Sequence, residues 1–218
     1  MAELDDLIAV AHEVSQTEAD AATTALYALP WLTQSIEDDR TAGGFTRWGR
    51  STVIDENVGS AVLSRAAFEA LHTLAGLPSA WPVGNAGLLH CYGYLLSLTP
   101  TPYGMKRDRW LDGQFARTLT LAADHFIPWA GDETLLARAD AAASGILSTA
   151  EWAWLSAIDG RMTQVGLGEE REGVRPLAYA VAPQSGMQPL LVTLFPIAGD
   201  DRTRRLIEGQ TRLRWNAV

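Results

Sequence analysis

The sequence predicts an α+β fold: a mainly antiparallel sheet, built from strands of the last third plus one or two earlier strands, and covered by helices from the first two thirds. Apolar residues recur at helical spacing in several segments before residue 148, whereas strand-like runs follow it. These runs are joined by hairpin turns and not by repeated β-α-β units, which indicates antiparallel pairing. Because the last third alone would be a bare sheet with an apolar face, we expect one domain over residues 1–218, with a possible sub-boundary near residue 148.

Helical periodicity predicts five helices before residue 148, at residues 3–15, 17–27, 59–75, 106–121 and 133–147. Pro30 is expected to end the second helix. Either Ser60 or Ser64 is a candidate cap for the third helix, and Asp132 for the fifth. The segment SIEDDRTAGGF, residues 35–45, is expected to be a polar loop because it contains a Gly-Gly pair.

Two segments between these helices are expected to be strands. GFTRWGRSTVID, residues 44–55, alternates in side-chain type, although Gly49 weakens the pattern. LLHCYGYLLSL, residues 88–98, is almost wholly apolar and aromatic and predicts a buried strand, with a buried helix as the alternative on so short a run. The following TPTPYG, residues 99–104, is expected to be non-helical, because a residue before proline favours extended geometry.

The last third predicts two hairpins. Asp159-Gly160, a strong hairpin dipeptide, separates two strand-like runs. RPLAYAVAPQSGMQPLLVTLFPI, residues 175–197, predicts the second hairpin. Residues 200–209 are expected to form a short helix, and residues 211–218 a last strand.

Composition indicates a bacterial cytoplasmic protein. The chain has 218 residues, one cysteine (Cys91) and a net charge of −9, with arginine far more frequent than lysine. The single cysteine excludes an intramolecular disulfide, and the negative charge disfavours binding to nucleic acid. The acidic N-terminus lacks the pattern of a signal peptide, and no apolar run is long enough for a membrane span. We therefore expect neither nucleic acid nor membrane as a partner.

The only lysine of the chain, Lys106, begins the cluster Lys106-Arg107-Asp108-Arg109-Trp110. Lysine differs from arginine in its compact ammonium, its readily shifted pKa and its ability to form a Schiff base. Cations in the first turn of a helix oppose the helix dipole unless an anion lies among them. We therefore expect Lys106 to be catalytic, and Arg107, Arg109 and Trp110 to bind a carboxylate or phosphate. The alternative is an exposed lysine within surface ion pairs.

A second cationic and aromatic cluster contains Arg47, Trp48 and Arg50. On a strand, Trp48 and Arg50 share one face, where they would form an aromatic wall beside a bidentate anion contact. We expect all three residues to bind substrate. The alternative is a surface strand with a half-buried tryptophan.

Proton transfer is expected from His90, Tyr92 and Tyr103. On a strand, His90, Tyr92 and Tyr94 share one face, and a histidine among tyrosines suits acid-base chemistry. Cys91 would then point away from His90, which argues against a nucleophilic Cys-His pair. The alternative is a core strand whose polar groups find partners inside the protein, and a helix would remove the geometric argument.

Together these residues predict an enzyme that acts on a small anionic metabolite, a carboxylate or phosphate, in a cleft between the helices and the sheet. The four scattered histidines lack metal-site spacing, and the glycine-rich stretches lack nucleotide-binding motifs, so we expect no metal and no cofactor. Lyase, isomerase and hydrolase chemistry all remain open.

The alternative function is a non-catalytic ligand-binding or protein-interaction module, or a subunit of a larger assembly. Trp152 and Trp154 are candidate interface residues, and the last strand is a candidate for pairing across a homodimer.

Overall fold

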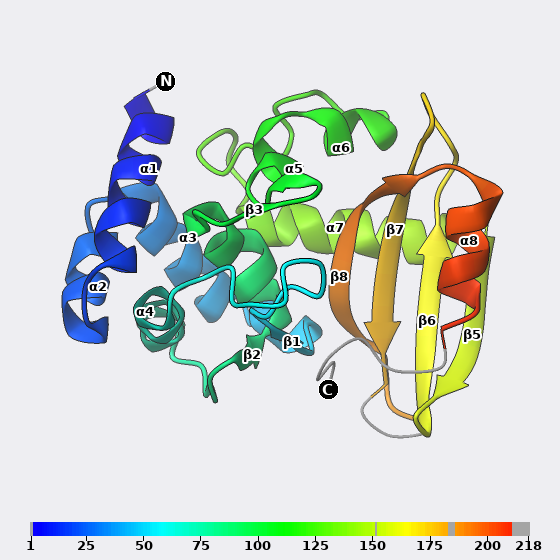
Figure 1. Ribbon diagram of the computed structural model, residues 1–218, viewed down its shortest axis with the longest axis horizontal. Helices are drawn as coiled ribbons and strands as arrows, with labels where there is room; N and C mark the ends of the chain where they lie inside the picture. Colours follow the sequence, from blue (N-terminus) through cyan, green and yellow to red (C-terminus); the bar gives the residue numbers. More distant parts are fainter. Residues whose placement is uncertain (1, 151, 183–185, 211–218) are drawn as a thin grey trace.

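The computed structural model describes residues 2–150, 152–182 and 186–210 and confirms the α+β class (Figure 1). The helical elements before the sheet are α1 (Ala2–Ser15), α2 (Ala19–Leu26), α3 (Pro30–Thr41), η1 (Gly44–Arg47), α4 (Arg65–Ala75), η2 (Leu88–Tyr92), η3 (Gly93–Leu96), α5 (Asp108–Leu111), α6 (Gln114–Thr118) and α7 (Leu135–Thr149). The strands of the last third are β5 (Trp152–Ile158), β6 (Arg161–Leu167), β7 (Val174–Val181) and β8 (Leu190–Ala198), and α8 (Asp201–Glu208) follows them.

The four late strands form one antiparallel sheet in the order β5-β6-β7-β8, as the two predicted hairpins require. Asp159 and Gly160 have φ values of 49° and 75°, the left-handed conformation of a tight hairpin turn. The earlier strands form two separate pairs, β1 (Arg50–Thr52) with β2 (Val83–Asn85) and β3 (Pro100–Thr101) with β4 (Gly104–Met105). The predicted strand at residues 211–218 and the side chains of Trp152 and Trp154 lie outside the part that the structure describes.

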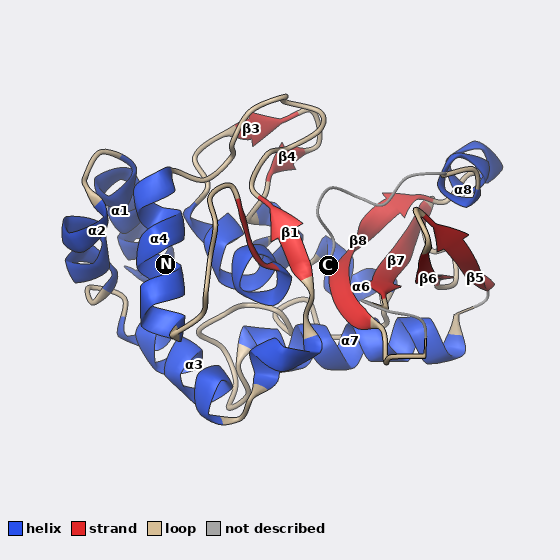
Figure 2. Ribbon diagram, turned by 90° about the horizontal axis from the view of Figure 1, so that it is seen from below, coloured by secondary structure: helices blue, strands red, loops and turns tan. Residues whose placement is uncertain are grey.

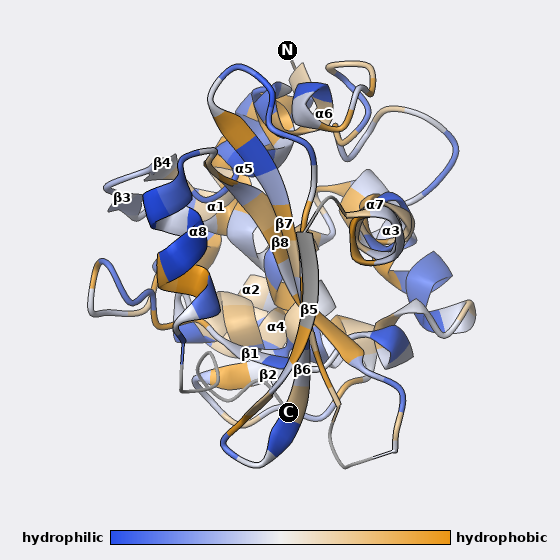
Figure 3. Cartoon of the chain, turned by 90° about the vertical axis from the view of Figure 1, so that its right-hand side faces the viewer, coloured by the Kyte–Doolittle hydropathy of each residue, from blue (hydrophilic) through white to orange (hydrophobic). Residues whose placement is uncertain are grey.

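Helices cover both faces of the sheet. Figures 2 and 3 show α7 along one face and α8 against the other. Ala178 and Ala180 of β7 belong to the main core with the helices, whereas the alternating Leu177 and Tyr179 belong to a smaller core with Ile207 of α8. The sheet is therefore anchored to the helices through its α7 face.

Two segments that were expected to be irregular or to end a helix belong to α3. The helix α2 ends at Leu26, close to its predicted end at Tyr27, and Pro30 begins the next helix, where its missing N–H and fixed φ are tolerated. The expected loop at residues 35–45 is largely helical, because Leu32 and Ile36 bury one face of α3 while Glu37 and Asp38 are exposed.

The segment at residues 44–55 is not one strand. Its first residues form the 3₁₀ turn η1, and only Arg50–Thr52 is extended. The Asn85 side-chain amide donates to the carbonyls of Phe45 and Trp48, at 3.0 Å and 3.4 Å, and these bonds hold the turn. Long-range contacts therefore override the local alternation.

The predicted helix at residues 106–121 is split into α5 and α6. Gly113, with φ 71°, separates them, and Asp112 accepts a hydrogen bond from the Gln114 N–H at 2.7 Å. The helix predicted at 133–147 is confirmed as α7, but Thr134 caps it in place of Asp132. Ser64, one of the two predicted caps, accepts from the Ala67 N–H at the start of α4.

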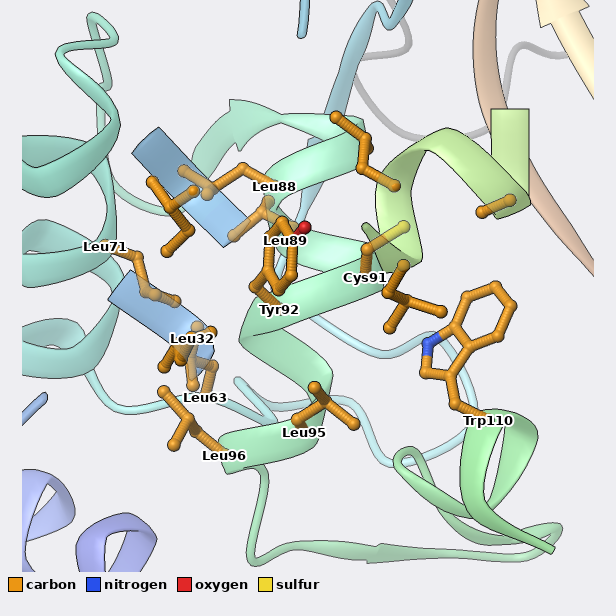
Figure 4. Packing of buried hydrophobic residues seen from close by; sticks show 14 of the residues in the cluster. Leu32, Leu63, Leu71, Leu88, Leu89, Cys91, Tyr92, Leu95, Leu96 and Trp110 are labelled. Carbon is orange, nitrogen blue, oxygen red and sulfur yellow. The ribbon is translucent and has the colours of Figure 1, made fainter. Parts of the chain in front are cut away.

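Residues 88–96 form a buried helical segment, η2 with a π-helical turn and η3 with a 3₁₀ turn, so the expected strand was wrong and its alternative is correct. Every residue of this segment is buried, and Figure 4 shows it surrounded by apolar side chains. A helix that is apolar on all sides has no 3.6-residue pattern, which is why the sequence did not distinguish it from a strand.

His72 connects α4 to β2. Its Nδ1–H donates to the Phe68 carbonyl at 2.7 Å, and its Nε2 accepts the Asn85 N–H at 3.2 Å, a pattern that requires the neutral imidazole. Burial lowers the pKa of His72. Gly84 of β2 lies directly against this ring, where a Cβ atom would collide with Nε2.

We expect Gly84→Ala to lower the free energy of unfolding by about 1–3 kcal/mol, the usual cost of overpacking a core. Its Cβ would meet the His72 imidazole and lie 2.9 Å from Phe68 Cε2. Gly145→Ala in α7 is the matched control: its Cβ meets nothing within 4 Å. Alanine is the better helix former, so this variant should gain about 0.5–1 kcal/mol. Urea unfolding measures both, and two effects of the same sign would contradict the packing at Gly84.

We expect the free energy of unfolding of the wild type to decrease, relative to that of His72→Leu, as the pH falls from about 7.5 to about 5. The decrease should be at most about 1.4 kcal/mol per pH unit. The folded-state pKa of His72 lies below its unfolded value, so its contribution is complete above the unfolded pKa and is lost as pH falls through the folded pKa. Urea unfolding at a series of pH values tests this, and parallel curves for the two proteins would contradict it.

Candidate functional site

A cleft of about 750 Å³ lies between the buried helical segment, the β3–β4 hairpin and the sheet. Its walls come from β1 and the turn after it, from η2 and η3, from the chain around α5, and from β8 with α8. In Figure 2 the β3–β4 hairpin and α8 stand on the same side of the molecule, opposite α7. The volume is within the range of small-molecule sites, which makes this cleft the candidate site.

Four of the predicted site residues line this cleft: His90, Tyr103, Lys106 and Arg109. They come from the buried segment, the β3–β4 hairpin and α5 with the residues before it. Tyr103 is 83% exposed at the hairpin, whereas His90 is only 4% exposed. The structure thus brings a histidine, a lysine and an arginine together at one concave surface.

Three further predicted residues lie behind the cleft wall. Tyr92 is fully buried, and its hydroxyl donates to Asp39 Oδ2 of α3 at 2.5 Å. The buried Trp110 indole donates to the His90 carbonyl at 2.8 Å, and an Arg107 Nη donates to the Ser97 carbonyl at 3.2 Å. Because the segment is helical, the expectation that His90 and Tyr92 share one face was wrong.

The cluster at residues 47–50 is not part of the cleft lining. Arg47 pairs with Asp140 of α7 at 3.0 Å, and Trp48 is buried in the main core. Arg50 is exposed on β1. Since residues 44–55 are not one strand, the expected pairing of Trp48 and Arg50 on a strand face was wrong.

Lys106 forms an ion pair with Asp55 at the cleft wall. The Lys106 ammonium contacts Asp55 Oδ2, and the two side chains are 19% and 5% exposed. Asp55 Oδ1 accepts the N–H groups of Asn57 and Val58, at 2.8 Å and 3.0 Å. The lysine is therefore not the exposed surface residue of the alternative interpretation.

The pKa values of this pair follow from burial and from their mutual charge. Burial acts to raise the pKa of Asp55, but its hydrogen bond and charge interaction with Lys106 hold that pKa below its usual value. Burial lowers the pKa of Lys106, although Asp55 acts against this shift. The carboxylate therefore stays ionised at neutral pH, with the ammonium as its partner.

The Tyr94 ring is shared by three site residues. His90 stacks on it, with centroids 4.9 Å apart and an interplanar angle of 27°. Lys106 Nζ and Arg109 Cζ lie 5.3 Å and 6.0 Å from its centroid, and Arg109 also lies 5.5 Å from the Phe195 ring of β8. Burial raises the pKa of Tyr94 to about 12, so the phenol keeps its proton at neutral pH.

His90 also contacts a serine that the sequence did not identify. Ser51 Oγ of β1 lies 3.1 Å from His90 Nε2, and both residues line the cleft. Ser51 lies in a three-residue strand without any motif, so no local signal marks it. The helical alternative for residues 88–98 predicts Tyr94, and not Tyr92, as the neighbour of His90, because a helix places residues four apart on one face.

The charges of the lining differ between its inner and outer parts. Lys106 and Arg109 are half-buried, whereas the acidic Glu56 and Asp112 are exposed. Asp55 pairs with Lys106, and the half-buried Asp108 lines the inner part together with Arg109. The inner part therefore contains charges of both signs, whereas these rim residues are acidic.

Within residues 2–150, 152–182 and 186–210, no three side chains of histidine, cysteine, aspartate or glutamate are grouped so that they could hold a metal ion. In the same ranges, none of the helices combines the length and the apolar character that crossing a membrane requires. Comparison of the chain with models of known protein families, with curated proteins and with solved structures found no match.

We expect Lys106→Met to lower the free energy of unfolding by about 2–3 kcal/mol, because it leaves the buried Asp55 carboxylate unpaired; the partial exposure of Lys106 keeps the cost below that of a fully buried pair. Adding Asp55→Asn should recover part of this loss, since it removes the orphan charge. Arg65→Met is the control, because it breaks an exposed pair with Glu69 and should cost less than about 1 kcal/mol. Equal losses in Lys106→Met and Arg65→Met, measured by urea unfolding, would contradict the buried pair.

Proposed function

We propose that the protein is an enzyme that binds a small anionic metabolite, a carboxylate or phosphate, in this cleft. One observation carries the proposal: His90 and Tyr94 of the buried segment converge with Lys106 and Arg109 on one concave surface. Titratable side chains that are partly buried together in a cleft of this size are typical of an active site.

In this proposal Arg109 is the main contact for the anion. A guanidinium group binds carboxylate or phosphate through two parallel hydrogen bonds. The aromatic rings of Tyr94, Trp110 and Phe195, all within 6.0 Å of the guanidinium carbon, reduce its contact with water and strengthen its electrostatic interaction with a ligand.

Lys106 serves as a second electrostatic contact. Its ammonium pairs with Asp55 and lies 5.3 Å from the centroid of the Tyr94 ring, which also contacts Arg109. His90 is the candidate for proton transfer, because its Nε2 lies 3.1 Å from the Ser51 hydroxyl at the cleft surface. The exposed acids at the rim support a small ligand and not a nucleic acid.

The second candidate function is a non-catalytic ligand-binding module. Tyr103 and Leu206 line the cleft and are 83% and 65% exposed, an apolar surface that suits contact with a partner. A homodimer and a bacterial cytoplasmic location belong to these proposals and are supported by composition alone. Turnover of the bound compound distinguishes the enzyme from the module.

We expect a thermal-shift screen of mono- and dicarboxylates, phosphate esters and sugar acids to find compounds that raise the melting temperature of the wild type. Arg109→Gln should weaken their binding by about 10- to 100-fold, because it removes a charge-assisted contact. Arg117→Gln, at an exposed position of α6, is the control and should bind as the wild type does. The proposal fails if no anion stabilises the wild type, or if Arg109→Gln retains its full affinity.

A further inference from the structure

We propose that Ser51 is a nucleophile activated by His90, so that the cleft hydrolyses an acyl derivative through an acyl-serine intermediate. The inference deepens the proposed function by naming the reaction class, and it rests on that proposal for the cleft as an active site. Its basis is the contact between the Ser51 hydroxyl and the His90 imidazole at the cleft surface.

The geometry of the two groups is that of a nucleophile and its base. Ser51 Oγ and His90 Nε2 are 3.1 Å apart, within hydrogen-bond reach. The two residues come from β1 and η2, which are far apart in the sequence, and both line the cleft. Ser51 is half-buried, so its hydroxyl contacts the histidine while its cleft side stays accessible to a substrate.

The imidazole is held in place by its surroundings. The Trp110 indole fixes the backbone of His90 through its carbonyl, at 2.8 Å, and the Tyr94 ring stacks on the imidazole face. His90 also lies within the π-helical turn Leu88–Tyr92, a local geometry that is frequent at functional sites. A base whose orientation is fixed by packing and by its backbone is the arrangement that proton transfer requires.

The serine is held by strand pairing. Ser51 pairs with Gly84 of β2, and Gly84 is packed against His72 of α4. This pairing keeps Ser51 on a short, fixed strand beside the buried segment. The nucleophile and the base are therefore both carried by elements that are anchored in the core, which restricts their relative motion.

The proposed reaction balances with water as the only co-reactant. Ser51 Oγ attacks the acyl carbon and forms a C–O bond while Nε2 of His90 accepts the hydroxyl proton. The bond to the leaving group then breaks, and the leaving group departs with the proton from His90. Water next attacks the acyl-serine ester, and His90 again accepts a proton and returns it to Ser51 as the carboxylic acid is released.

Positive charge near the base supports this assignment. Lys106 and Arg109 contact the same Tyr94 ring as His90, at 5.3 Å and 6.0 Å from its centroid. The tetrahedral intermediate carries a negative oxygen, which such fixed charges stabilise in a partly desolvated cleft. The released product is a carboxylate, the same chemical group that Arg109 is proposed to bind.

The test is covalent labelling of the full-length protein with a fluorophosphonate, a reagent that phosphonylates activated serine hydroxyls. We expect one adduct by intact mass, located at Ser51 by peptide mapping, and none in Ser51→Ala. His90→Gln, which keeps much of the side-chain volume but removes the base, should slow labelling at least about 100-fold. Ser60→Ala, at an exposed position of the neighbouring turn, is the control and should label as the wild type does.

A second readout is the hydrolysis of p-nitrophenyl acetate, where the wild type should release a burst of p-nitrophenol close to one equivalent per protein before slower turnover. Circular dichroism establishes that each variant is folded. Absence of a Ser51 adduct in folded wild type, or labelling that is unchanged in His90→Gln, would overturn the inference. If the carboxylate screen still finds ligands that need Arg109, the proposed function survives that failure; if Ser51 is labelled but no anion binds, only the anion proposal fails.

Discussion

The fold depends on a helical segment that has no exposed face. Every residue of Leu88–Leu96 is buried, so each polar group in it must find a partner inside the protein. Asp39 of α3 accepts the Tyr92 hydroxyl, Trp110 donates to the His90 carbonyl, and the Asn85 side chain accepts the Leu88 N–H at 3.0 Å. These bonds join α3, α5 and β2 to the segment, and they make one wall of the cleft part of the protein core.

The same segment separates core residues from cleft residues by its helical geometry. His90 and Tyr94, four positions apart, stack on each other at the cleft, whereas Tyr92 lies between them in sequence and points into the core (Figure 4). Cys91 is likewise buried, and burial is the main cause that raises its pKa. The burial of Cys91 and Tyr92 in the core therefore orients the segment so that His90 and Tyr94 face the cleft.

The sequence correctly predicted those parts of the fold that depend on residues close to one another in the chain. The Asp159-Gly160 turn and the short helix α8, which Asp200 caps, depend on residues close by in the chain, and both the turn and the helix were predicted from the sequence. The buried segment was predicted as a strand because an all-apolar run carries no period. In the site, Lys106 was identified from composition, whereas the contacts of Asp55 with Lys106 and of Ser51 with His90 join residues that are far apart in the chain.

The site also explains why the chain uses lysine at one position and arginine three residues later. Asp55 already accepts two backbone N–H groups, so the compact ammonium of Lys106 fits its remaining oxygen as a point charge. Arg109 instead lies among aromatic rings, where a planar guanidinium packs well. One of these rings, Tyr94, belongs to the helical wall, and another, Phe195, belongs to the sheet. The anion proposed to bind Arg109 would therefore lie where the two walls of the cleft meet, next to the histidine on which Tyr94 stacks.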